Sequence, residues 1–147
     1  MRTLILLSLI ALVQGCTIRQ DIKPVNDASI TQLTIIENPD VKLTYLKGLR
    51  EDIEAKGIQT DLAPARTPPE EYAYALTYTA NWAWDLALYM VYTKIDVYKE
   101  GAPIGNALYD ARMGVPTWGG SSTLKIKSMN SWESFFPTPR KINSVSR

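Results

Sequence analysis

The chain has 147 residues, which suits a single domain, and its 46% hydrophobic and 21% charged residues are typical of a globular protein. Sixteen Lys and Arg balance fifteen Asp and Glu without any block of like charge, which argues against a nucleic-acid-binding role. The chain has no histidine and one cysteine, so the commonest general base is missing, no internal disulfide can form and no metal-ligand spacing exists. We therefore expect no metal, no cofactor and no enzymatic activity.

Residues 1–15 have the layout of a secretory signal peptide. Arg2 gives a positive start, and Leu4–Val13 is apolar apart from Ser8. A bilayer span needs about 20 apolar residues, so this run is too short to cross a membrane as a helix. Its length matches the hydrophobic region of a signal peptide. A buried core helix is the alternative, but no polar face or N-cap accompanies the run.

The residues that close this run, Val13-Gln14-Gly15-Cys16, resemble the lipobox of bacterial lipoproteins. The resemblance implies cleavage before Cys16, a diacylglycerol on its thiol and acylation of the new amine. Three acyl chains would hold the protein on a membrane, because each buried methylene contributes about 0.8 kcal/mol. In similar lipoproteins an Asp after the cysteine implies retention in the inner membrane. Thr17 stands there instead, so we expect the outer membrane, on its periplasmic face.

The lipidated cysteine and the polar segment after it, residues 16–28, are predicted to form a tether. Pro24 interrupts the segment, and about a dozen flexible residues reach roughly 20 Å. We expect residues 29–136 to form one domain close to the membrane. Residues 137–147 contain Pro137 and Pro139 near their start, and we expect them to be a loosely held tail.

The first half of the domain predicts a strand, a helix and a second strand. β-Branched residues indicate a strand over 29–36. Asn38 suits a helix cap and Pro39 the first helical position, and Gly57 is a plausible end for that helix. Alternating residues predict a short strand over 58–63. The apolar face of the helix is expected to carry Val41, Tyr45, Leu46, Leu49 and Ile53.

Large and small side chains then alternate from Tyr72 to Asp85. The alternating run and its continuation are too long for one strand, since strands have about 3–10 residues. We therefore place a reversal near residues 84–87, a second strand over 88–98 and a third over 104–112. These three strands form an antiparallel meander, which predicts an α+β two-layer sandwich with a mainly antiparallel sheet packed against one main helix.

The segments ITQLTIIENPDV, YTANWAWDLALYM and IGNALYDA, together with the lipobox, resemble an uncharacterised family of small bacterial envelope lipoproteins. The strongest motifs of this resemblance are Trp82-x-Trp84-Asp85 and Gly105-x-Ala107-x-Tyr109. The layout is similar, more loosely, to the small α/β domains of curli-export and TolB-N-like envelope proteins. The resemblance implies a fold and a place in the cell envelope.

Aromatic residues supply the candidate interaction sites. The row at strand period can form core, or it can form a platform that stacks on sugar rings such as those of peptidoglycan. Trp118 and Trp132 lie in irregular segments, where they can contact a protein or pack against the sheet edge. Asp85 is interpreted as a turn residue within the same interaction region. The row consists of Tyr72, Tyr74, Tyr78, Trp82 and Trp84.

Two patterns of polar residues carry little weight as catalytic sites. Ser122 and Lys125 match the Ser-x-x-Lys spacing of penicillin-binding enzymes, but the companion motifs are missing and the pattern indicates a loop. Glu70 and Glu71 lie one strand length from Asp85, about 45 Å at about 3.3 Å per residue, too far for a shared carboxylate pair.

These observations predict a non-enzymatic, membrane-anchored lipoprotein that binds another envelope component, most simply a protein. The alternative is a carbohydrate-binding module that uses the aromatic row. The exposure of Trp82 and Trp84 separates the two hypotheses, because a platform needs both rings in solvent.

Overall fold

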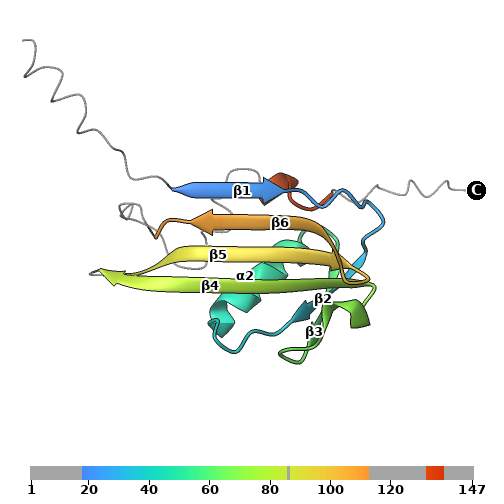
Figure 1. The fold of residues 1–147 in the computed structure, drawn as a ribbon, viewed down its shortest axis with the longest axis horizontal. Helices are drawn as coiled ribbons and strands as arrows, with labels where there is room; N and C mark the ends of the chain where they lie inside the picture. The colour runs from blue at the N-terminus through green and yellow to red at the C-terminus, as the bar shows by residue number, and fades with distance from the viewer. Residues whose placement is uncertain (1–17, 86, 113–131, 138–147) are drawn as a thin grey trace, which may run out of the picture.

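The computed structural model describes residues 18–85, 87–112 and 132–137, and it contains a six-stranded mixed sheet with one α-helix against one face (Figure 1). The strands lie in the order β1-β6-β5-β4-β2-β3. This architecture confirms the predicted α+β two-layer fold. The elements are β1 (Arg19–Lys23), β2 (Gln32–Ile36), α2 (Leu43–Glu54), β3 (Gln59–Ala63), η1 (Pro69–Glu71), β4 (Tyr74–Asp85), β5 (Ala87–Lys99), β6 (Ala102–Asp110) and η2 (Trp132–Ser134).

The predicted meander is confirmed as the centre of the sheet. Strand β4 pairs antiparallel with β5, and β5 with β6. The first reversal lies where Asp85 pairs with Ala87, within the predicted interval. The second turn is made by Glu100 and Gly101, both with positive φ, which glycine adopts without strain.

Helix α2 begins four residues later than predicted, at Leu43 instead of Pro39. The Asn38 side chain accepts a hydrogen bond from the Asp40 N–H at 3.0 Å, and the Asn38 carbonyl accepts one from Val41 at 3.1 Å. These bonds form a turn before the helix, and the Asn38 amide also donates to the Tyr78 carbonyl of β4 at 2.9 Å. Asn38 therefore fixes the loop to the sheet instead of capping the helix. The predicted end is confirmed, since Gly57 has φ +80° just after the last turn.

The prediction of a flexible tether over residues 16–28 is wrong for the described part of that segment. Residues 19–23 form β1, which pairs antiparallel with β6. Beyond β1, Val25 is buried and its N–H donates to the Phe135 carbonyl at 2.8 Å. The polar segment folds because the edge of β6 offers unpaired backbone groups that β1 satisfies. The folded domain therefore begins three residues after Cys16.

The C-terminal segment closes the core. The short 3-10 helix η2 lies beside the arrowhead of β1 (Figure 1). The Trp132 and Phe135 rings stack at 5.2 Å, and Phe135 meets Phe136 edge-on at 4.8 Å. All three side chains are buried. The Lys56 ammonium donates to the Glu133 carbonyl at 2.8 Å, which ties the turn to the end of α2.

Candidate functional site

Most of the aromatic row is core. Tyr78 is buried and stacks on Tyr45 of α2 at 5.8 Å, and the half-buried Trp82 meets the Tyr45 ring edge-on at 6.0 Å. The Lys42 ammonium lies 5.0 Å above the Trp82 ring. Tyr74, Tyr78 and Trp82 therefore pack with the core that includes α2, and Tyr72 packs against a second buried cluster, so the row does not form one exposed sugar platform. Trp84 is the exception, with 73% of its surface exposed.

Trp84 lies at the far end of β4, directly opposite Leu88 of β5. Residues paired across two strands project to the same side of the sheet, so the two side chains are neighbours. Leu88 is also exposed, at 39%. Trp84 and Leu88 together are called the hairpin end below, and the β4–β5 hairpin that carries them extends past β6 and β1 (Figure 1). Asp85 follows as the last residue of β4, at the reversal where the sequence places it.

A cross-strand row of four residues marks where the neighbouring strands stop. Arg19 of β1 pairs with Asp110 of β6, Asp110 with Tyr92 of β5, and Tyr92 with Asn81 of β4. The Arg112 guanidinium donates to both oxygens of Asp110 at 2.9 and 2.6 Å, and it lies 4.4 Å above the Tyr92 ring. These bonds lower the pKa of Asp110 to about 2. The row is a charged and paired boundary, and among the strands of the described residues only those of the β4–β5 hairpin continue beyond it.

Of the other candidate residues, one lies in the core and the rest lie outside the described residues. Trp132 is 1% exposed, so the expectation that it offers a protein contact is wrong. Its ring contacts both Phe135 and Phe136, at 5.2 and 6.0 Å between ring centroids. Cys16, Trp118, Ser122 and Lys125 lie outside the described residues.

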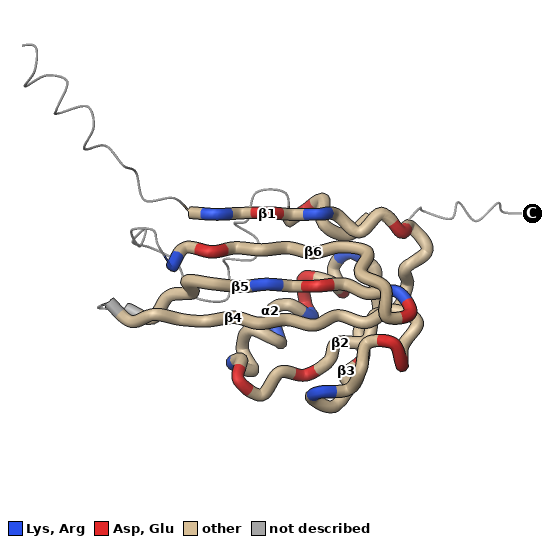
Figure 2. Tube along the Cα trace, viewed as in Figure 1, with Lys and Arg blue, Asp and Glu red and all other residues tan. Residues whose placement is uncertain are grey.

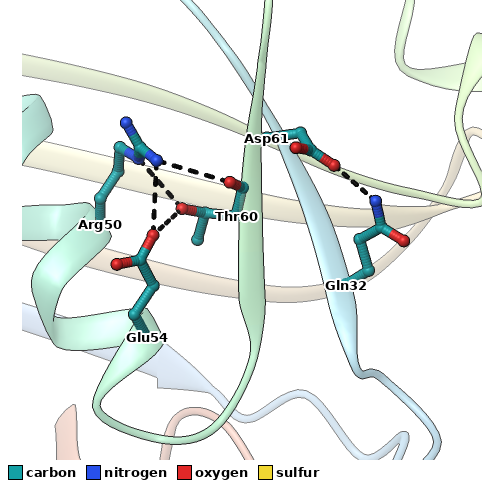
Figure 3. A network of polar contacts seen from close by, with 5 residues as sticks. All are labelled: Gln32, Arg50, Glu54, Thr60 and Asp61. Atoms are coloured by element: carbon teal, nitrogen blue, oxygen red, sulfur yellow. Dashed lines mark hydrogen bonds and ion pairs between the residues drawn. The ribbon is translucent and has the colours of Figure 1, made fainter.

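The exposed face of α2 carries a polar network toward edge strand β3 (Figure 3). The Arg50 guanidinium donates to the Thr60 hydroxyl at 3.0 Å and pairs with Glu54 at 3.4 Å, while the Thr60 hydroxyl donates to Glu54. Gln32 and Asp61 are bonded to each other on the neighbouring strands. Each of these groups has a partner in the network. The network therefore stabilises the packing of α2 on β3 and presents no free reactive group.

A polar hollow of about 350 Å³ opens where β2 and β3 end. It is lined by residues 36–40, 65–67 and 77–79, which include the exposed Glu37, Asp40 and Arg66. The Tyr78 hydroxyl accepts the Asn38 N–H at 3.2 Å, and burial raises the pKa of this phenol. In the described part of the chain, no group of three His, Cys, Asp or Glu side chains could hold a metal ion. We assign no catalytic constellation to this hollow.

Asp27 fixes the loop between β1 and β2 to the opposite end of the sheet. It accepts hydrogen bonds from the Lys99 ammonium and the Tyr74 hydroxyl, both at 2.7 Å. The neighbouring Ser29 donates to the same carboxylate through its N–H. The Lys99 bond contributes most to holding the pKa of Asp27 well below its usual range.

This pKa predicts an acid-sensitive fold. A carboxylate with a lowered folded-state pKa stabilises the protein above its unfolded-state pKa of about 4 and loses that effect as the pH falls toward the folded-state value. We expect Asp27→Asn to lower the urea midpoint at pH 7 and to flatten the decline of stability below pH 4. Lys99→Gln should reproduce the change, and the double variant should add little to it. An unchanged pH profile in Asp27→Asn would contradict this role.

Within the described residues, no helix combines the length and apolar character that crossing a bilayer requires.

Comparison with known proteins finds solved structures of similar fold but no similar sequence. No protein-family model matches the chain, and no curated protein sequence matches it. A solved structure of a PelC dodecamer from Paraburkholderia phytofirmans aligns with a TM-score of 0.43 and 17% identity, over 63% of this chain and 78% of that chain. A dodecamer of a point variant of the same protein aligns with a TM-score of 0.51 and 18% identity, over 80% of this chain and 97% of that one. The second alignment shows that nearly the whole PelC chain shares its fold with this protein.

Proposed function

We propose that the chain is a lipid-anchored, non-enzymatic assembly protein of the bacterial cell envelope, which holds a small binding domain directly against the membrane. The start of β1 at Arg19 carries this proposal. Three residues span at most about 10 Å, so a lipid on Cys16 keeps the sheet next to the bilayer surface. A partner held at that surface meets the domain at a fixed height, which suits an assembly role.

The first partners of the domain are further copies of itself. The domain presents a helix layer on one side and an open sheet face on the other, and charges of both signs are scattered over it without a single-sign patch (Figure 2). On the helix layer, Leu43 is 79% exposed beside a hollow of about 280 Å³ along α2. Contact between the helix layer of one copy and the sheet face of the next joins two different surfaces, and such contacts can close into rings. The PelC structure that shares the fold is a dodecamer, which supports assembly from copies of one chain.

The anchor and the assembly are tested on the same preparation. The protein is extracted from membranes in mild detergent, and its intact mass and oligomeric state are measured by mass spectrometry and light scattering. We expect a chain that begins at Cys16 with three acyl chains, and a defined oligomer that Leu43→Asp converts to monomer. Leu62→Asp is the matched control, because Leu62 is an exposed leucine on edge strand β3.

The two halves of the proposal can fail separately. A mature chain that begins elsewhere, or carries no fatty acid, contradicts the anchor. A monomer in every detergent, without crosslinks between copies in the membrane, contradicts the assembly.

A further inference from the structure

We propose that the hairpin end, Trp84 and Leu88, inserts into the interfacial layer of the bilayer that holds Cys16. This inference rests on the proposed lipid anchor and adds a second membrane contact that fixes the orientation of the domain.

The strand register places the hairpin end and the start of β1 at the same end of the sheet. Arg19 and Asn81 belong to one cross-strand row, on β1 and β4. Trp84 lies three residues beyond that row, about 10 Å at about 3.3 Å per residue. Cys16 lies three residues before Arg19, so the chain can place it at most about 10 Å beyond the row. Strand β1 begins at the end of the sheet where β4 finishes, so the hairpin end and the start of β1 lie at the same end of the sheet.

The exposed apolar side chains gather at this end. Five large hydrophobic side chains are exposed among the described residues, and three of them, Ile18, Trp84 and Leu88, lie beyond the boundary row. Strand β4 has no charged residue from Tyr74 to Trp84 and ends in Asp85, so Asp85 is the one charged residue that this strand brings to the interface. The amphipathic indole of tryptophan favours the membrane–water interface. A lipid surface therefore fits the composition of this end better than a polar ligand.

Insertion of the hairpin end is too weak to hold the protein on the membrane by itself, but it can orient a domain that a lipid already anchors. Removing one apolar side chain such as leucine from water favours the buried state by about tenfold to a hundredfold. Once the lipid holds the chain, insertion becomes intramolecular, so this modest gain is enough to populate one orientation. The strands then point away from the membrane, and the end of the sheet near Asp27 and Gly101 lies farthest from it.

Depth-dependent fluorescence quenching tests the inference on the complete lipidated protein. The protein is purified from membranes, its lipid is verified by mass, and it is reconstituted into vesicles of phosphatidylethanolamine and phosphatidylglycerol that contain lipid brominated near the headgroup. We expect quenching of tryptophan fluorescence, and we expect Trp84→Phe to remove most of it without changing the fold. Leu88→Asp should reduce the quenching of Trp84 as well.

Leu62→Asp provides the matched control. Leu62 is 44% exposed, close to the 39% of Leu88. The register places it level with Leu76, eight residues before Trp84 and about 26 Å from it along the strand direction. Leu62→Asp should leave the quenching unchanged, whereas a general effect of a new charge would reduce it in both variants.

Three results would overturn the inference. Lipidated protein whose quenching is absent, or is the same in Trp84→Phe, shows that the hairpin end stays in water while the anchor stands. Crosslinks from position 84 to another copy, in place of quenching, assign the hairpin end to the assembly. Protein without lipid on Cys16 removes both the anchor and the inference built on it.

Discussion

Replacing Phe135 by alanine should lower the free energy of unfolding by about 3–5 kcal/mol, the usual range for a large aromatic side chain removed from a core. Phe135 is fully buried, stacks on Trp132 and meets Phe136 edge-on. Domains of this size are stable by about 5–15 kcal/mol, so the variant should lie close to the limit of folding. Urea unfolding followed by circular dichroism measures the change.

Glu133→Ala is the control for this prediction. Glu133 belongs to the same short turn, but its side chain is exposed and its 3.4 Å ion pair with Lys56 lies at the surface. Surface ion pairs contribute about 0–1 kcal/mol, so this variant should unfold close to the wild type. If Phe135→Ala were as stable as Glu133→Ala, the aromatic cluster would not be the closure of the core.

The Phe135→Ala substitution should also loosen β1. The Phe135 carbonyl accepts the Val25 N–H just after that strand, and Val25 packs against Gly105 of β6. Hydrogen exchange of the β1 amides should therefore accelerate in Phe135→Ala more than exchange in β4, because local opening follows the loss of local contacts. The segment next to the proposed anchor thus depends on residues more than a hundred positions away in the chain.

The parts of the fold that were predictable are those with a periodic apolar pattern. The buried face of α2 and the alternation along β4 and β5 follow from burial on one side, which imposes a period of 3.6 or 2. Strand β1 lacks this signal, since its residues Arg19–Lys23 are polar apart from Ile22 and lie at an edge, where charged side chains are typical. Its pairing depends on β6, which is distant in the sequence, so local patterning could not find it.

The candidate site shows the same limit. Trp82 and Trp84 have identical positions in the alternation, yet one packs on Tyr45 and the other is exposed, because the helix layer does not extend to the end of β4. Trp132 stands in a segment without periodicity, although the nearby Phe135 and Phe136 were a signal of a buried cluster. The structure also explains Gly105 of the Gly105-x-Ala107-x-Tyr109 motif. A Cβ at this position would lie 2.6 Å from the Val25 side chain, so only glycine leaves room for the chain beyond β1.

Cys16→Ser should release the protein from the membrane fraction. Each buried methylene of an acyl chain contributes about 0.8 kcal/mol, and one chain alone gives only marginal, reversible binding. Trp84 and Leu88 add at most about 1.5–3 kcal/mol each when fully buried, together about 3–6 kcal/mol, which corresponds to dissociation constants from roughly millimolar to roughly tens of micromolar without an anchor. Fractionation and labelling with a fatty-acid analogue should therefore show unlabelled protein in the soluble fraction.

Thr17→Asp is the matched control for this prediction, because it keeps the lipobox and changes only the residue after the cysteine. By the resemblance to bacterial lipoproteins, this variant should stay lipidated and move from the outer to the inner membrane. The pair of variants separates attachment from destination: Cys16→Ser abolishes both the label and the attachment, and Thr17→Asp changes only the membrane. If the Cys16→Ser protein remained membrane-bound, a contact other than the lipid on Cys16 would hold it there. The three-residue distance to Arg19 would then no longer fix the height of the sheet above the bilayer.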